Sequence, residues 1–356
     1  MKATYHRYIL DFKRPSGTSR GVLTQKETWF ILLEKDGKKG IGECGILRGL
    51  SIDDRLDYEE KLQWTCNNIE LGKDQLWEDL IEFPSIQFGV EMAFQSLASK
   101  TPFDLFPSDF TKGNKSIQIN GLVWMGEPAF MKEQIEEKLA QGFRCIKLKI
   151  GAIDFDKELQ LLAFIRAHFT PEQVEIRVDA NGAFDSNEAL YKLSQLSEFK
   201  LHSIEQPIQK NHTDRMAELC KITPLPIALD EELIGVFSFE EKEALLLKIK
   251  PQYIILKPSF IGGFKGTQEW ILLAEKHKIG WWITSALESN IGLNAIAQWT
   301  FLHHNLMPQG LGTGALYTNN FDCPLQVSQG QLWYEKETGW GFDFDQLKNR
   351  SNNLHN

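Results

Sequence analysis

The feature that most constrains the fold is a series of eight short apolar segments, nearly evenly spaced between residues 116 and 312. Each is followed by a longer amphipathic stretch, and the segments end at Asn120, Lys149, Asp179, Glu205, Asp230, Lys257, Ser285 and Gly312. The steps between these ends run from 25 to 30 residues, and a strand with its crossover helix takes about 30 residues. Eight such units are what a closed parallel barrel requires. The spacing therefore predicts an α/β fold with a TIM-type (β/α) barrel over residues 113–324.

The residues on either side of this series follow a different pattern. Strands are expected at residues 28–34, 40–44, 332–334 and 340–342, and helices within residues 55–100. Asp36 and Gly37 fit the tight turn of a hairpin between the first two strands. We therefore expect an N-terminal α+β capping domain over residues 1–112, completed by the C-terminal tail, residues 325–356.

Composition narrows the functional class. Hydrophobic residues make up 42% of the chain and charged residues 24%, as is usual for a soluble globular protein. The net charge of −9 lacks the basic footprint of a nucleic-acid-binding protein. Five cysteines, an odd number without a Cys-x-x-Cys pair, indicate reduced thiols rather than disulfides or a zinc site. With no apolar signal core or membrane-length apolar run, we expect a cytoplasmic protein without nucleic-acid or membrane partners, and leave oligomerisation open.

Five predicted strands in succession end in a charged residue, namely Lys149, Asp179, Glu205, Asp230 and Lys257. The active site of a (β/α) barrel lies at the C-terminal ends of its strands. Charges inside such a barrel are costly unless they meet one another or an ion. This pattern therefore indicates a single polar site at the barrel mouth.

The three carboxylates fit a metal site. Asp179, Glu205 and Asp230 end consecutive strands, and neighbouring strands lie about 4.8 Å apart. Their mutual repulsion would be relieved by a divalent cation, and oxygen-only ligands suit Mg²⁺, with Mn²⁺ as a second choice. The alternative is three separate surface or helix-capping carboxylates. Three in series at strand ends favour the metal site.

The lysines fit a catalytic base and its partners. Lys147 and Lys149 are two residues apart on one strand, so they point to the same side, and Lys257 ends a strand across the mouth. A nearby metal and a second ammonium both disfavour protonation, which allows Lys149 to act as a base near neutral pH. The alternative is a structural ion pair with Asp179 or Glu205. For Lys147 that role is as well supported as a catalytic one.

These parts together indicate one type of reaction, the removal of a proton next to a carboxylate. The resulting ene-diolate is stabilised by a metal ion and helped by an ammonium group. Lysine bases with Mg²⁺ perform this chemistry in the enolase superfamily. A small-molecule carboxylate is therefore the expected substrate.

The sequence resembles the enolase superfamily, in its muconate-lactonizing-enzyme-like branch. The matching motifs, in order and spacing, are Lys147-Leu148-Lys149, Asp179-Ala180-Asn181-Gly182, Ile204-Glu205-Gln206-Pro207, Leu229-Asp230-Glu231 and Ile255-Leu256-Lys257-Pro258. The resemblance covers nearly the whole chain. It implies the barrel, the capping domain, the metal and the lysine base.

Within that branch the chain resembles the o-succinylbenzoate synthases of menaquinone biosynthesis. The matching stretches are residues 257–263, 285–292 and 310–314. The resemblance implies a lyase that dehydrates 2-succinyl-6-hydroxy-2,4-cyclohexadiene-1-carboxylate. It also implies that Lys149 removes the proton and that Lys257 lies over the other face of the ring as a cation.

Candidate substrate-binding residues are Asn181, Ser285, Asn120 and Arg20. Ser285 and Asn120 end predicted strands, where a turn-capping role is equally consistent with the sequence. Arg20 belongs to a polar loop that could close over the barrel mouth and clamp the succinyl carboxylate, with a solvated loop as the alternative. The loop after Gly45 could also face the site.

Two other functions remain open. Dipeptide epimerases and N-succinylamino acid racemases need a base on each face of the substrate, which Lys149 and Lys257 could supply. The epimerases typically carry an Asp-x-Asp after the eighth strand, whereas this chain has Gly312-Thr313-Gly314-Ala315 there and Asp322 further on. A non-catalytic metal-binding barrel would need neither lysine.

Overall fold

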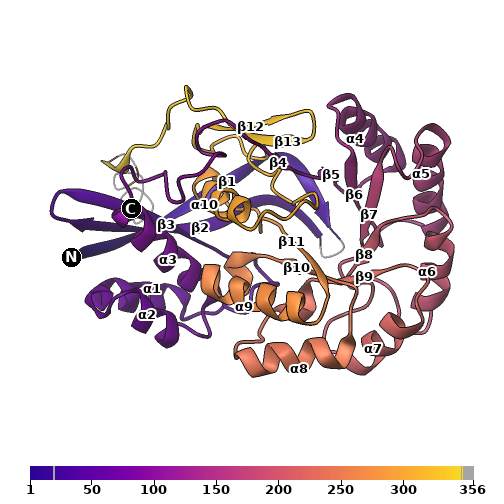
Figure 1. The fold of residues 1–356 in the computed structure, drawn as a ribbon, viewed down its shortest axis with the longest axis horizontal. Coiled ribbons are helices and arrows are strands. Elements are labelled where there is room, and N and C mark those ends of the chain that lie inside the picture. The colour runs from indigo at the N-terminus through magenta and orange to yellow at the C-terminus, as the bar shows by residue number, and fades with distance from the viewer. Residues whose placement is uncertain (19–20, 346, 348–356) are drawn as a thin grey trace.

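The computed structural model describes residues 1–18, 21–345 and 347. Figure 1 shows two parts, an N-terminal antiparallel sheet with short helices against it and a barrel of parallel strands flanked by helices. The long strands β1 (Lys2–Thr18) and β2 (Gly21–Lys35) extend from the first part toward the barrel (Figure 1). Among the described residues, no helix is both long enough and apolar enough to cross a membrane.

The N-terminal sheet has the order β1-β2-β3. Its strands are β1 (Lys2–Thr18), β2 (Gly21–Lys35) and β3 (Lys38–Gly45). Strands β2 and β3 are joined by a two-residue turn at Asp36 and Gly37, whose φ angles of 51° and 77° are both positive. Such a turn matches the right-handed twist of a hairpin, so the predicted hairpin is confirmed.

Short helices pack against this sheet. They are α1 (Tyr58–Asn67), the 3₁₀ helix η1 (Ile69–Leu71), α2 (Lys73–Asp79) and α3 (Pro84–Ala98). Helix α3 lies so close to β3 that a Cβ added at Gly42 would come within 1.8 Å of the Gly89 carbonyl oxygen. The absence of a side chain at Gly42 is therefore what allows this helix to approach the strand.

The barrel sheet has seven parallel strands in the order β11-β10-β9-β8-β7-β6-β5. The strands are β5 (Gly121–Val123), β6 (Cys145–Lys149), β7 (Glu175–Asp179), β8 (Ser203–Glu205), β9 (Ile227–Leu229), β10 (Tyr253–Leu256) and β11 (Gly280–Ile283). The helices are α4 (Pro128–Ala140), α5 (Phe155–His168), α6 (Ala189–Ser197), α7 (Thr213–Ile222), α8 (Phe239–Ile249), α9 (Gly263–Lys276) and α10 (Asn290–Leu302). Two 3₁₀ helices, η2 (Glu231–Leu233) and η3 (Pro258–Phe260), follow β9 and β10. This alternation confirms the predicted barrel fold.

The ring closes without a regular eighth strand. Isolated parallel bridges join Thr284 to Gly310 and Ile119 to Gln309. The predicted strand at residues 309–312 is therefore reduced to bridging residues.

The predicted first strand, residues 116–120, is divided between two sheets. Its residues β4 (Ile117–Gln118) pair with a C-terminal strand, and the barrel strand β5 begins only after Asn120. Asn120 thus precedes the first barrel strand, and the prediction that it ends that strand was wrong. The reason is competition for pairing. The C-terminal strand pairs with Ile117 and Gln118, whereas Ile119 bridges to Gln309 in the barrel.

Two segments of the C-terminal tail make different contacts. Strands β12 (Leu325–Ser328) and β13 (Gln331–Tyr334) form a hairpin that pairs with β4. The prediction of a strand at residues 340–342 was wrong, since this segment packs through its rings: Trp340 stacks on Phe103 with ring centroids 4.1 Å apart. We propose that residues 1–112 with the tail form one domain and residues 113–324 the other.

Candidate active site

The charged strand ends line up at one end of the barrel because of the sheet register. Lys149 on β6 pairs with Asp179 on β7, which pairs with Glu205 on β8. Asp230 and Lys257 directly follow β9 and β10. The C-terminal ends of five neighbouring strands thus bring these five side chains together.

The lysine and carboxylate groups form a continuous buried network. Lys149 Nζ lies 2.6 Å from Asp179 Oδ2, and Lys147 Nζ lies 2.8 Å from the same oxygen. Lys147 also contacts Glu205. Lys257 contacts Asp230 and lies 3.9 Å from Glu205 Oε1. Each carboxylate therefore has at least one ammonium partner.

Burial and neighbouring charges shift the pKa values of these groups in different directions. Burial, supported by the positive charges of Lys147 and Lys257, lowers the pKa of Lys149. Burial also opposes the charged form of Lys147, but the attraction of Asp179 and Glu205 outweighs it and raises the pKa of Lys147. The two lysines of one strand thus differ, and Lys149 is the better proton acceptor.

The carboxylates differ as well. Burial, followed by repulsion from Asp179, raises the pKa of Glu205. For Asp179 and Asp230 burial acts in the same sense, but the adjacent lysine charges outweigh it and lower the pKa of both. The repulsion between neighbouring carboxylates is the electrostatic feature that a cation would relieve.

The donor set suits a divalent cation, although the ligands are not arranged around one. The part of the chain that the structure describes contains no group of three His, Cys, Asp or Glu side chains positioned as a metal cage. Lysine ammonium groups contact the three carboxylates instead. One buried oxygen, Oε1 of Glu205, has no hydrogen-bond partner among the described residues. Buried carboxylate oxygens of this kind fit Mg²⁺ in chemical type.

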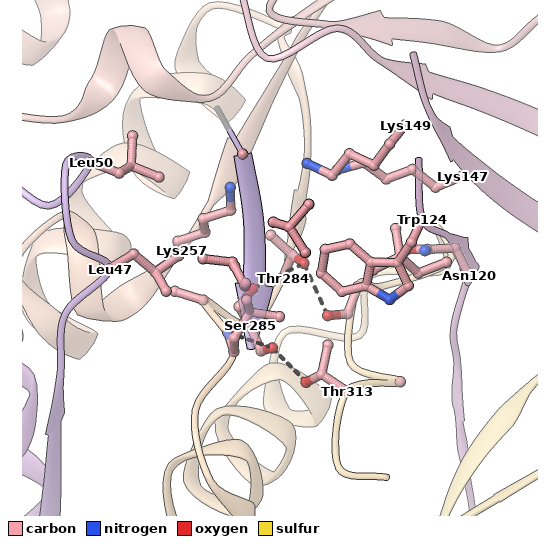
Figure 2. A pocket seen from close by; sticks show the side chains of 18 of the residues that line it. Leu47, Leu50, Asn120, Trp124, Lys147, Lys149, Lys257, Thr284, Ser285 and Thr313 are labelled. Atoms are coloured by element: carbon pink, nitrogen blue, oxygen red, sulfur yellow. Dashed lines mark hydrogen bonds between the residues drawn. The ribbon is translucent and has the colours of Figure 1, made fainter. Parts of the chain in front are cut away.

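A cavity of about 180 Å³ lies beside the three lysines. Figure 2 shows Lys147 and Lys149 extending into it from one side and Lys257 from the other. Two residues of the N-terminal part, Leu47 and Leu50, form the wall opposite Trp124 and Asn120 (Figure 2). The cavity thus combines cationic groups with apolar walls.

The predicted substrate-binding residues have different positions. Ser285 and Asn120 line the cavity, and the Ser285 hydroxyl lies 2.6 Å from Thr313 Oγ1. Asn181 accepts a hydrogen bond from Lys149 Nζ at 2.8 Å and donates one to Glu231 at 3.1 Å, so it holds the proposed base. Arg20 lies outside the described residues.

Several cavity residues were not identified from the sequence. Trp124 comes from the loop after β5, and Arg48 follows β3 together with Leu47 and Leu50. The guanidinium of Arg48 is already bonded to Glu27 and Asp54. The only sequence signal for this wall was the position of the loop after Gly45, which does face the site.

Two known protein families match this chain, one over its N-terminal part and one over the barrel. Residues 1–97 match the family described as "MenC, N-terminal domain". Residues 130–348, more than half of the chain, match "Enolase C-terminal domain-like". The first match covers most of the N-terminal part, and the second covers most of the barrel and the C-terminal tail.

Individual relatives agree. An o-succinylbenzoate synthase of Desulfotalea psychrophila is 52% identical over 363 residues, covering 93% of this chain and 98% of the relative. The crystal structure of MenC from the same organism has a TM-score of 0.83 at 48% identity, covering 94% of this chain and 99% of that one. A hydrophobic dipeptide epimerase of a Flavobacteria bacterium is 30% identical over 365 residues, covering 95% of this chain and 99% of the relative. The chain belongs to the o-succinylbenzoate synthase (MenC) family, lyases of the enolase superfamily.

Proposed function

We propose that this enzyme dehydrates 2-succinyl-6-hydroxy-2,4-cyclohexadiene-1-carboxylate to o-succinylbenzoate, a step of menaquinone biosynthesis, with Lys149 as the base. The observation that carries the assignment of roles is the arrangement of the lysines. Lys149 and Lys257 extend from opposite sides of one cavity (Figure 2), and each contacts a buried carboxylate, Asp179 and Asp230 respectively. The substrate is assigned from the 52% identity to the o-succinylbenzoate synthase of D. psychrophila.

Lys149 is suited to both proton transfers. Its lowered pKa favours the neutral amine, which takes the proton from the ring carbon next to the carboxylate. The electron pair left behind spreads into the carboxylate as an ene-diolate. When it returns, the carbon–oxygen bond of the ring hydroxyl breaks, and the proton held by Lys149 leaves with that oxygen as water. One base on one face makes this a syn elimination.

Lys257 and Lys147 have supporting roles. Attraction to Asp230 and Glu205 outweighs burial and raises the pKa of Lys257, which keeps it a cation. That charge faces the ring from the side opposite Lys149 and stabilises the developing negative charge. Lys147 stays protonated between Asp179 and Glu205 and disfavours a second ammonium at Lys149.

Enzymes of this superfamily typically use a divalent metal ion. We propose Mg²⁺, with Mn²⁺ as a substitute, held by Asp179, Glu205 and Asp230. When bound, the ion supplies Lewis acidity to the substrate carboxylate. Oε1 of Glu205, which is buried and accepts no hydrogen bond from the described residues, supports this position.

An ultraviolet assay tests the proposal directly. Purified enzyme with Mg²⁺ should convert the cyclohexadiene to the aromatic product, and EDTA should stop the conversion. Wild-type enzyme that binds Mg²⁺ but leaves the cyclohexadiene unchanged would refute the function.

Epimerase activity is the alternative, favoured by the two facing lysines and the related dipeptide epimerase. The cavity is lined by Gly312 and Thr313 where an epimerase would place acids for the substrate ammonium, and Asp322 is not among its lining residues in the described chain. In D₂O an epimerase would exchange the α-hydrogen of dipeptides. We expect no such exchange here.

We also propose a cytoplasmic location. All five cysteines are buried and free, as expected of a protein kept in a reducing compartment.

A further inference from the structure

The cavity wall formed by residues 284–287 follows β11 and contains Ser285, Ala286 and Leu287. Leu287 has a φ of 64°, a left-handed conformation that a branched side chain rarely adopts. Its amide donates to the Ser285 hydroxyl at 3.3 Å, and its carbonyl accepts from Tyr317 at 2.6 Å. This wall therefore depends on surrounding contacts for its shape.

Glu288 is one source of those contacts. One carboxylate oxygen accepts a hydrogen bond from Ala286 N at 2.7 Å, and the other accepts from Ser259 Oγ at 2.6 Å. Ser259 belongs to η3, which begins directly after Lys257. The side chain of Glu288, fully buried, thus connects the wall to the strand end that carries the cationic lysine.

Glu43 provides the second source, from the other part of the molecule. This buried residue of β3 accepts hydrogen bonds from Ser289 N at 2.8 Å, Ser289 Oγ at 2.6 Å and Gly292 N at 2.8 Å. Thr28 donates to it from the neighbouring strand at 2.9 Å. Glu43 therefore holds the N-terminal end of α10 immediately after the cavity wall.

A buried lysine lies beside these two carboxylates but makes no direct connection. Lys26 experiences the negative charges of both Glu43 and Glu288. Its Nζ has no hydrogen-bond partner among the residues that the structure describes. The hydrogen bonds that fix the wall are therefore those of the carboxylates.

We infer that Glu43 and Glu288 are positioning residues that fix the cavity wall at residues 285–287, so that substrate binding depends on the contact between β3 of the N-terminal part and the start of α10. The inference rests on the proposed function, because this wall lines the cavity in which we propose that substrate and product bind. Neither Glu43 nor Glu288 is among the described residues that line the cavity.

The test compares Glu43→Gln, Glu288→Ala and Glu288→Gln. In the Glu43→Gln variant the new amide, in either orientation, leaves one backbone N–H, of Ser289 or Gly292, without an acceptor. Glu288→Ala removes both contacts of that side chain, whereas the amide of the Glu288→Gln variant can donate to Ser259 and accept from Ala286 N. We expect Glu43→Gln and Glu288→Ala to raise the KM and the product Kd at least about fivefold, and Glu288→Gln to recover most of that loss.

The matched control is Glu91→Gln. Glu91 is also a buried carboxylate of the N-terminal part, and it accepts hydrogen bonds from the barrel helix α9 at Phe264 N and Lys265 N. It does not line the cavity among the described residues. This variant should keep KM and product Kd within about twofold of wild type. Steady-state kinetics and calorimetric titration of o-succinylbenzoate measure the two quantities.

Circular dichroism gives the folded fraction of each variant. Loss of folded protein alone would lower kcat and the number of binding sites while leaving KM and Kd unchanged, and that result would overturn the inference. If Glu288→Ala does not fold, Ser259→Ala removes one of its two contacts and should raise KM in the same direction. Failure of the proposed function would appear differently, as wild-type enzyme that neither binds o-succinylbenzoate nor consumes the cyclohexadiene.

Discussion

Lys149 Nζ and Asp179 Oδ2 lie 2.6 Å apart at the ends of paired strands β6 and β7. The sheet register sets this separation, because the two residues are direct partners in the ladder. The same aspartate oxygen lies 2.8 Å from Lys147 Nζ. One carboxylate thus serves two amines with oppositely shifted pKa values, which distinguishes the proposed base from its neighbour.

Replacing Lys149 by alanine should abolish turnover while the protein stays folded. General acid–base catalysis contributes about 10²- to 10⁴-fold, and Lys149 is proposed for both proton transfers, so kcat should fall at least about 10³-fold. The ultraviolet assay measures the loss, and circular dichroism checks the fold. Lys157→Ala, at an exposed position of α5, is the control. Turnover near the wild-type rate would exclude Lys149 as the base.

Chelation should remove activity without unfolding the protein. Lys147 contacts Asp179 and Glu205, and Lys257 contacts Asp230, so each buried carboxylate keeps an ammonium partner in the metal-free protein. Mg²⁺ at about a hundred times its Kd should then add about 2.7 kcal/mol to the free energy of unfolding. Thermal unfolding with and without Mg²⁺ measures this gain. Glu205→Gln should largely lose it, whereas Glu240→Gln, at an exposed position of α8, should retain it.

Substituting alanine for Gly42 should destabilise the N-terminal part. The added Cβ would lie 1.8 Å from the Gly89 carbonyl oxygen, so β3 and α3 must move apart. Overpacking of this kind costs about 1–3 kcal/mol. Denaturant unfolding measures the change. The matched control is Gly339→Ala, because a Cβ there meets nothing within 4 Å, and equal stability of the two variants would contradict the prediction.

Glu91 should make stability depend on pH. Burial raises its pKa from 4.5 to about 7 despite two backbone hydrogen bonds. Because the folded pKa exceeds the unfolded one, its contribution is complete below pH 4.5 and is lost as pH rises through about 7. A shift of this size corresponds to about 3 kcal/mol.

Unfolding free energies between pH 4.5 and 7.5 test this dependence. Glu91→Gln cannot ionise, so its stability should decline less over that range than that of wild type. Glu60→Gln changes an exposed acid of α1 and should leave the pH dependence as it is in wild type. Parallel curves for Glu91→Gln and wild type would show that Glu91 does not titrate in this range.

The barrel and the position of its charged mouth could be predicted from the sequence because both depend on local patterns. Strand and helix periods, with units of nearly constant length, determine which residues stand at the strand ends. Parallel register then brings Lys149, Asp179 and Glu205 side by side. The catalytic roles of these residues stay predictions, but their proximity follows from the repeat alone.

Other features were decided only by packing between distant segments. Whether Ile117 and Gln118 pair within the barrel depends on β13, which lies more than 200 residues later and pairs with both of them. The segment at residues 340–342 has the composition of a strand, but stacking of Trp340 on Phe103 replaced pairing. A pattern of residue types records which side chains can be buried, but not which of several partners will bury them.

Thus the sequence by itself determined the barrel and the charges at its mouth, because the covalent spacing of each β/α unit places them there. Only the tertiary structure decided how that mouth is enclosed. Leu47 and Leu50 reach the cavity, and Glu43 reaches Ser289, 246 positions away, because the N-terminal sheet packs on the barrel. No local periodicity encodes such contacts, since they arise from the complementary shape and polarity of two surfaces that lie far apart in the sequence.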